Sequence, residues 1–154
     1  MYASKIYSIA KRDGRLKKCF YGVLAANEIP KIFPVKHGAI INCCPRGLPG
    51  IHWVCIFKMN KNLIEFYDPL GKTPEHYKLK NKLFKIAPKI QYSSMRVQNR
   101  ASTVCGYHCL FYLYYKSRGF SLNIILRNFC KKNTRENDRR VVVRVTKLFN
   151  LKKT

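Results

Sequence analysis

The sequence predicts an α+β protein with a small central mixed sheet and helices packed against it. Two short strands, Ile51–Phe57 and Leu63–Asp68, flank the polar connection Met59–Asn62 and together predict a β-hairpin. A second run, between Cys105 and Gly119, is apolar on nearly every side, which predicts a helix buried in the core. The chain has 154 residues, which suits one domain over residues 1–154.

The segments before the hairpin predict little regular structure. Residues 1–21 are mixed and basic and predict one short helix that ends near Gly22. Gly22–Pro34 contains two prolines and favours a loop. Gly38–Asn42 is short and apolar, and Cys43–Gly50 (CCPRGLPG) has the composition of a turn or loop.

Between the hairpin and the buried helix, residues 72–88 are basic and predict partly helical structure. Ile90–Val97 alternates weakly and predicts a third strand, which leads to Gln98. Ser102 and Thr103 are suitable N-caps for the buried helix, and Gly119 is a suitable C-terminal stop.

Beyond the buried helix, the expected elements are a further helix, a loop and one ambiguous segment. Ser121–Cys130 predicts a helix with Ser121 as its N-cap, and Asn133–Asp138 predicts a charged loop. In Val141–Leu151 the β-branched residues favour a strand, whereas the apolar spacing favours a helix.

Cys105 falls in or just before the first turn of the buried helix. There the helix dipole and the unpaired amides stabilise a thiolate, which is what a nucleophilic cysteine requires. The alternative is that Cys105 is a small buried residue, as free cysteines usually are. Cys109, one turn later, is expected to pack into the core.

The hairpin brings a candidate base and a candidate acid together. A turn centred near Asn60 places His52 directly opposite Asp68, and a carboxylate beside an imidazole orients it and stabilises its charged form. Glu65 is another candidate acid, but strand alternation places it on the face opposite His52. His52 would then take the proton of Cys105.

Acyl transfer also requires donors for an oxyanion. The backbone N–H of Cys105 is one, because the first amides of a helix lack partners within it. The side chain of Gln98, seven residues earlier, is the second candidate. Trp53 is expected to pack beside this site. The chemistry predicted here needs no cofactor and no metal.

Charge is the strongest global signal, with 31 Lys and Arg against 7 Asp and Glu and a formal net charge of +24. Such an excess predicts a polyanion partner, contacted through phosphates without sequence preference, namely DNA. The seven cysteines are an odd number and do not resemble a secreted disulfide framework, so we expect free thiols inside a cell. No apolar run reaches membrane-spanning length, so no membrane partner is expected.

Three stretches together resemble the adenovirus maturation protease (adenain) family. They are Gly50-Ile51-His52-Trp53, then Phe66-Tyr67-Asp68-Pro69-Leu70-Gly71, then Gln98 with Ser102 and Val104-Cys105-Gly106. The resemblance extends over roughly residues 20–118 and places the chain in the clan that includes the SUMO-type cysteine proteases.

The resemblance implies a cysteine endopeptidase with a papain-like site in permuted order, His52, Asp68, Gln98, Cys105. Such enzymes process precursor proteins of a virus or a virus-like mobile element, next to small residues and often glycine. They act inside the particle, where DNA stimulates and guides them. By resemblance we expect a monomer located in the virion and in the nucleus or cytoplasm of the host cell.

Two departures from the adenain pattern matter. The acid position holds Asp68, as in the SUMO-type branch, instead of glutamate. Phe84–Val97 contains no cysteine, so a disulfide-linked peptide activator is not expected, although an activating peptide of another kind stays open.

Three other interpretations of the sequence stay open. One is a same-clan protease that removes ubiquitin-like modifiers, for which such strong basicity has little use. A second is a basic nucleic-acid-binding protein without catalysis, whose helix tyrosines stack on bases. The third is a zinc site of Cys105, His108 and Cys109, which lacks the second knuckle typical of structural zinc unless the Cys43-Cys44 pair supplies it.

Overall fold

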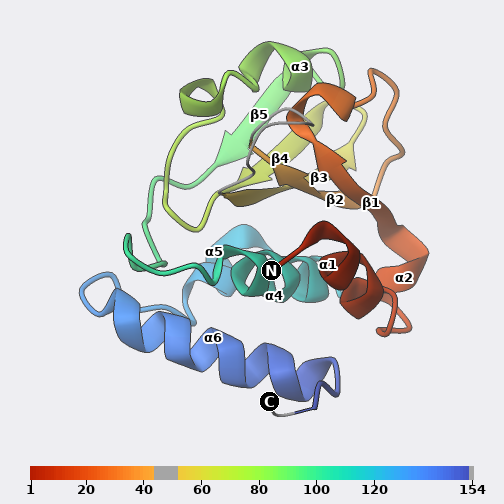
Figure 1. Cartoon of the computed structure of the whole chain (residues 1–154). Helices are drawn as coiled ribbons and strands as arrows, with labels where there is room; N and C mark the ends of the chain where they lie inside the picture. The colour runs from red at the N-terminus through yellow and green to blue at the C-terminus, as the bar shows by residue number, and fades with distance from the viewer. Residues whose placement is uncertain (44–51, 153–154) are drawn as a thin grey trace.

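A five-stranded mixed sheet forms the centre of the protein (Figure 1). The computed structural model describes residues 1–43 and 52–152. The strand order is β1-β2-β3-β4-β5; the two outer pairs are parallel and the inner pairs antiparallel. The predicted α+β class is therefore confirmed. The strands are β1 (Phe20–Ala25), β2 (Gly38–Asn42), β3 (Trp53–Asn60), β4 (Leu63–Tyr67) and β5 (Lys89–Tyr92).

Helices cover both faces of this sheet. In Figure 1, α4 and α1 lie against one face, α6 packs on the far side of α4, and α3 lies over the opposite face. No helix in the described part of the chain is long and apolar enough to cross a membrane. The helices are α1 (Ala3–Ala10), α2 (Leu16–Cys19), η1 (Ala26–Glu28), η2 (Glu75–Tyr77), α3 (Lys80–Phe84), α4 (Cys105–Lys116), α5 (Leu122–Leu126) and α6 (Thr134–Leu148).

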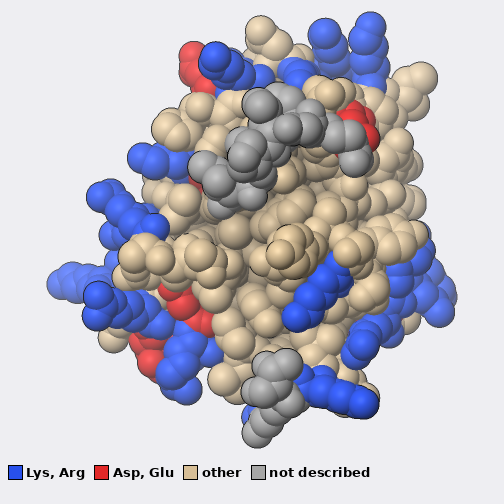
Figure 2. Space-filling model, in the orientation of Figure 1, with Lys and Arg blue, Asp and Glu red and all other residues tan. Residues whose placement is uncertain are grey.

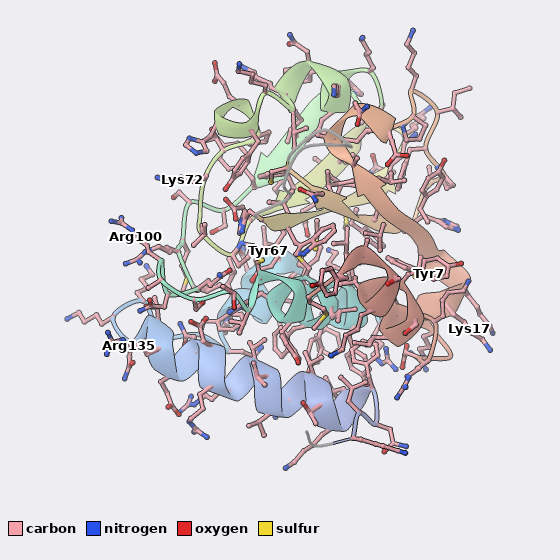
Figure 3. All side chains as sticks on the ribbon, viewed as in Figure 1. Tyr7, Lys17, Tyr67, Lys72, Arg100 and Arg135 are labelled. Carbon is pink, nitrogen blue, oxygen red and sulfur yellow. The ribbon has the colours of Figure 1, made fainter. Side chains whose placement is uncertain are left out.

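Strand alternation divides the core into two clusters. Odd-numbered residues of β3 and β4 face α4, where Tyr67 stacks on Tyr112 with ring centroids 4.6 Å apart. Figure 3 shows Tyr67 between the sheet and α4. Even-numbered residues such as Ile56 and Phe66 face the other way and pack with Leu83 of α3. The predicted burial of α4 and of Cys109 is confirmed.

The α4 side of the core contains a buried ion pair. Lys116 Nζ lies 3.1 Å from Glu65 Oε1, and both side chains are 2% exposed. Tyr112 donates its hydroxyl hydrogen to the same carboxylate at 2.7 Å. Glu65 therefore binds Lys116 and Tyr112 in the middle of the core, and it is not the acid at the end of the hairpin that carries His52.

The predicted hairpin forms, but its register is two residues out of step with the predicted one. Phe57 pairs with Glu65, and β3 continues to Asn60 through an irregularity after Lys58. A shift of two residues returns every side chain to the same face, so the predicted common face of His52 and Asp68 survives.

Two predictions for the first part of the chain need correction. Residues 1–21 hold two helices and not one, and the loop predicted over Gly22–Pro34 begins with the last four residues of strand β1 and the short helix η1, so only its later part is a loop. A register shift lies between Phe20 and Gly22, and Gly22 has φ +147°. This irregularity disturbs the alternation of side chains, so the sequence pattern does not indicate a strand here. The turn predicted over Cys43–Gly50 lies, beyond Cys43, outside the described residues.

The C-terminal predictions were partly wrong. The predicted charged loop Asn133–Asp138 is the beginning of α6, and its N-cap, Asn133, accepts a hydrogen bond from Glu136 N. The ambiguous segment that begins at Val141 is helical as far as Leu148. The helix after Ser121 ends early, at Leu126, although Ser121 is its N-cap as predicted. The strand predicted over Ile90–Val97 is likewise shorter than expected, because β5 ends at Tyr92.

Candidate active site

His52 and Asp68 meet just beyond the paired ends of β3 and β4. His52 immediately precedes β3 and Asp68 immediately follows β4. His52 Nε2 lies 2.6 Å from Asp68 Oδ1, and both residues are buried. These two side chains are in contact, as the hairpin pattern predicts.

Asp68 is held by three further hydrogen bonds. The backbone N–H of Leu70 donates to Oδ1 at 2.9 Å, and that of Lys72 donates to Oδ2 at 3.0 Å. The hydroxyl of Tyr77 donates to Oδ2 at 2.7 Å. Burial and the bond to Asp68 raise the pKa of Tyr77, so this hydroxyl keeps its proton. The carboxylate that faces His52 is therefore fixed in place.

The turn after Asp68 requires a glycine. Gly71 has φ +73° and donates its N–H to the Asp68 carbonyl at 2.9 Å. A β-carbon at this position would lie 2.7 Å from the carbonyl oxygen of Ser94 and 2.9 Å from the nitrogen of Arg96. Both contacts are with backbone atoms, which cannot turn away.

Cys105 is the first residue of α4, and this helix end has no side-chain cap. The N-cap residue is Val104, whose side chain makes no capping hydrogen bond. The predicted capping by Ser102 was wrong, since its buried hydroxyl has no hydrogen-bond partner. The first amides of α4 therefore remain available for a thiolate or an oxyanion.

Cys105 forms a hydrogen bond with His52. Since Asp68 engages Nε2, the ring nitrogen left for the thiol is Nδ1. Burial opposes the charged imidazole, but the bonds to Asp68 and Cys105 outweigh it and raise the pKa of His52 to about 9. Burial likewise opposes the thiolate, yet the bond to His52 lowers the pKa of Cys105 below its usual value. At neutral pH His52 therefore carries its proton, and the charged imidazole favours the thiolate of Cys105.

Backbone groups add to this stabilisation of the thiolate. The N–H groups of Trp53 and Gly106 both lower the pKa of Cys105. The Trp53 indole donates to the carbonyl of Met1 at 3.1 Å, which ties the N-terminal segment to β3. The predicted packing of Trp53 beside the site is confirmed.

Gln98 is buried, 1% exposed, on the loop between β5 and α4. Its backbone N–H donates to the carbonyl of Pro69 at 2.9 Å, so the loop is attached to the turn that carries Asp68. Its side-chain Nε2 donates to the Ser102 carbonyl at 3.1 Å. This bond identifies the nitrogen end of the amide and leaves the second N–H of that nitrogen for another acceptor.

The zinc interpretation finds no support. Across residues 1–43 and 52–152, no three His, Cys, Asp or Glu side chains converge as metal ligands. His108 bonds instead to Asp138, with Nε2 2.8 Å from Oδ1. Cys19, Cys55, Cys105, Cys109 and Cys130 are free thiols. Burial raises the pKa of Cys55 and of Cys109, so these thiols are poor nucleophiles.

Several residues that support this site were not predicted from the sequence. Tyr77, in a stretch predicted only as partly helical, holds Asp68. Asn137 and Asp138 hold the loop of Gln98 from α6. One overlooked signal was the Asn133-to-Glu136 spacing, which is a typical start of a helix.

No protein-family model matches the sequence, and no curated protein matches it. Among solved structures, the crystal structure of the ASFV pS273R protease matches with a TM-score of 0.55 at 16% identity, over 91% of this chain. A second structure of that protease, with selenomethionine, matches at 20% identity with a TM-score of 0.42, over 68% of this chain and 42% of the other. The match to the first of these structures shows that this chain shares its fold. The chain spans 65% of the length of that first structure.

Proposed function

We propose that this chain is a cysteine endopeptidase. Cys105 is the nucleophile, His52 the general base and acid, and Asp68 the residue that orients His52. Gln98 and the N–H of Cys105 donate to the oxyanion. The observation that carries the proposal is the bond of Cys105 to His52, which in turn bonds Asp68 at 2.6 Å. This set lies at the uncapped start of a buried helix.

The geometry suits acyl transfer in two stages. The thiolate of Cys105 attacks the peptide carbonyl, and the oxygen becomes negative where the helix amide and Gln98 can donate. His52, already protonated, gives its proton to the leaving amine. Water then attacks the thioester while His52 takes its proton, and Cys105 is released. Asp68 keeps His52 in one tautomer throughout.

For the substrate we propose precursor proteins of a virus or virus-like element, cut next to glycine or other small residues. The fold likeness to a viral protease and the resemblance of the His52, Asp68 and Cys105 stretches to the adenain family support this assignment. The alternative is a protease of ubiquitin-like modifiers, which would use the same residues. Its substrates end in two glycines, so the two proposals differ in what the site must accept.

We further propose that DNA guides the enzyme as a sequence-independent partner of a monomer, in the virion and the host nucleus or cytoplasm. The net charge of +24 supports DNA binding. Figure 2 shows many Lys and Arg side chains around this face and few acidic ones. In Figure 3, Lys72, Arg100 and Arg135 lie along one edge of the molecule. A purely nucleic-acid-binding role does not explain the thiolate–imidazolium pair.

A peptide panel tests the function directly. Wild type and Cys105→Ala would be assayed on glycine-containing peptides and on ubiquitin-like tails, each with and without duplex DNA. Cleavage of the peptides that Cys105→Ala abolishes and DNA stimulates supports the proposal. Heparin serves as the control for polyanions in general, and rising salt should remove the stimulation by DNA.

Other outcomes point elsewhere. Cleavage of ubiquitin-like tails alone, indifferent to DNA, would assign the chain to the modifier proteases. If no peptide is cut and Cys105 reacts with iodoacetamide no faster than other thiols at neutral pH, the thiolate argument fails and the binding role becomes the better account. A reactive Cys105 without cleavage would direct the search to a missing activating peptide.

A further inference from the structure

The three residues centred on Gln98 have their backbone polar groups bound from two sides. On one side, the N–H groups of Val97 and Gln98 both donate to the Pro69 carbonyl at 2.9 Å. On the other side, α6 supplies two side chains. Asn137 Nδ2 donates to the Val97 carbonyl at 3.0 Å, and Asp138 Oδ2 accepts from the Asn99 N–H at 3.1 Å. The position of Gln98 therefore depends on α6.

Asp138 also binds α4 through its other oxygen. Its Oδ1 lies 2.8 Å from Nε2 of His108, which is completely buried and stands one turn after Cys105 on α4. Burial lowers the pKa of His108, although Asp138 opposes this, so the imidazole is neutral. Its proton then resides on Nε2 and is donated to Asp138, which agrees with the unpartnered, buried Nδ1. One carboxylate thus joins the loop of Gln98 to the helix of Cys105.

This arrangement matters because the two oxyanion donors come from those two elements. One donor is the side chain of Gln98 on the loop, and the other is the N–H of Cys105 on α4. Their spacing decides whether both reach one oxygen, and a displacement of about 1 Å costs roughly a hundredfold in rate. Asp138 joins these two elements through its hydrogen bonds to Asn99 and His108.

We propose that Asp138 is a positioning residue for the oxyanion hole, acting through Asn99 and His108. Asn137 holds the same loop through its bond to the Val97 carbonyl. This inference rests on the proposed cysteine protease function. It predicts that loss of the Asp138 bridge weakens stabilisation of the tetrahedral intermediate. The thiolate–imidazolium pair, which other residues hold, should stay intact.

Asp138→Ala tests the inference when three quantities are measured on the same preparation. The value of kcat should fall roughly tenfold to a hundredfold, with KM nearly unchanged. The affinity for a peptide aldehyde, whose adduct with Cys105 mimics the tetrahedral intermediate, should fall by a similar factor. The rate of alkylation of Cys105 by iodoacetamide should stay within about threefold of wild type, because this reaction forms no oxyanion.

Glu136→Ala is the matched control. It removes a carboxylate from the same helix, but Glu136 pairs with Arg139 and Arg140 on the surface and takes no part in the bridge. All three measurements should match wild type. A second pair of variants addresses folding. His108→Gln keeps a donor near the place of Nε2 and should retain activity, whereas His108→Leu removes it and should behave like Asp138→Ala.

The outcomes separate the two proposals. If wild type cleaves peptides and Asp138→Ala cleaves them equally well, Asp138 has no positioning role. If alkylation of Cys105 falls in parallel with cleavage, the substitution disturbs the nucleophile or the whole fold, and the inference is overturned. If Asp138→Ala is too unstable to assay, the comparison of His108→Gln with His108→Leu decides. A wild type that cleaves nothing, and whose Cys105 reacts with iodoacetamide no faster than its other thiols, refutes the protease function itself.

Discussion

Asp68→Asn is the substitution that best tests the electrostatics of the site, because it removes the charge of the side chain and keeps its size and shape. In the wild type, Asp68 Oδ1 accepts from His52 and Leu70, and Oδ2 accepts from Lys72 and Tyr77. The asparagine nitrogen is best placed toward Tyr77, whose hydroxyl can rotate and accept. The N–H of Lys72 then loses its acceptor, at a cost of about 1–3 kcal/mol in the free energy of unfolding.

The magnitude follows from the pKa of His52. That pKa stands at about 9, well above its ordinary value of 6.5, and each unit is worth about 1.4 kcal/mol. Cys105 contributes part of this increase, so we assign roughly one to two units to Asp68. Without the carboxylate, the thiolate–imidazolium pair loses that stabilisation. Its population at neutral pH should fall roughly tenfold to a hundredfold.

The assay is the pH dependence of Cys105 alkylation by iodoacetamide, read by mass spectrometry. It is best done in a Cys130→Ser background, because Cys130 is exposed and backbone hydrogen bonds lower its pKa. In Asp68→Asn the inflection should move to higher pH by roughly one to two units. Tyr77→Phe, which removes a hydrogen-bond donor but no charge, is the control and should shift the pH of the inflection much less. An unchanged inflection in a folded Asp68→Asn variant would refute the assigned role of Asp68.

Three further predictions rest on other parts of the structure. For wild type, kcat/KM should rise as Cys105 loses its proton, below the usual pKa of a thiol, and should fall again near pH 9 as His52 loses its own. Calorimetry should show that Gly71→Ala lowers the free energy of unfolding by more than the ~1–2 kcal/mol expected for Gly119→Ala. Gly119 has a similar φ, +85°, but open space around it, so an equal cost would show that the clash at Gly71 is not real. Glu65→Gln leaves Lys116 buried without its counter-charge and should cost about 3–5 kcal/mol by denaturant unfolding; a loss below 1 kcal/mol would contradict the pairing.

The sequence was informative wherever the argument depended on a short-range pattern. Two apolar runs separated by a polar turn predict the hairpin, and the period of two in a strand tolerates the observed register error. His52 and Asp68 therefore stayed on one face even though Phe57 pairs with Glu65. The position of Cys105 at the start of α4 was predicted from Ser102 and Thr103 as N-caps, and the position is correct although the N-cap is Val104 and no side chain caps the helix.

The sequence failed where polar residues act across long separations. Asn137 and Asp138 sit in the segment TRENDRR, whose charge resembles a solvated loop. Their partners, Val97 and Asn99, lie about forty residues away, and no local pattern connects them. The same holds for Tyr77, whose hydroxyl contact with Asp68 depends on the path of the chain after Gly71. Burial of a polar side chain is a property of the fold and not of its immediate neighbours.

The missing cap of α4 shows how these two kinds of information combine. Local propensity favours Ser102 or Thr103 as a cap, and a cap is worth about 1 kcal/mol to a helix. In the structure this capping hydrogen bond is absent, and the Ser102 hydroxyl is buried without a hydrogen-bond partner. A capped helix would have its first amides occupied, so they would be unavailable to a thiolate or an oxyanion. Local stability is lost at the residue where the proposed chemistry needs free donors, which is where propensity rules are expected to fail.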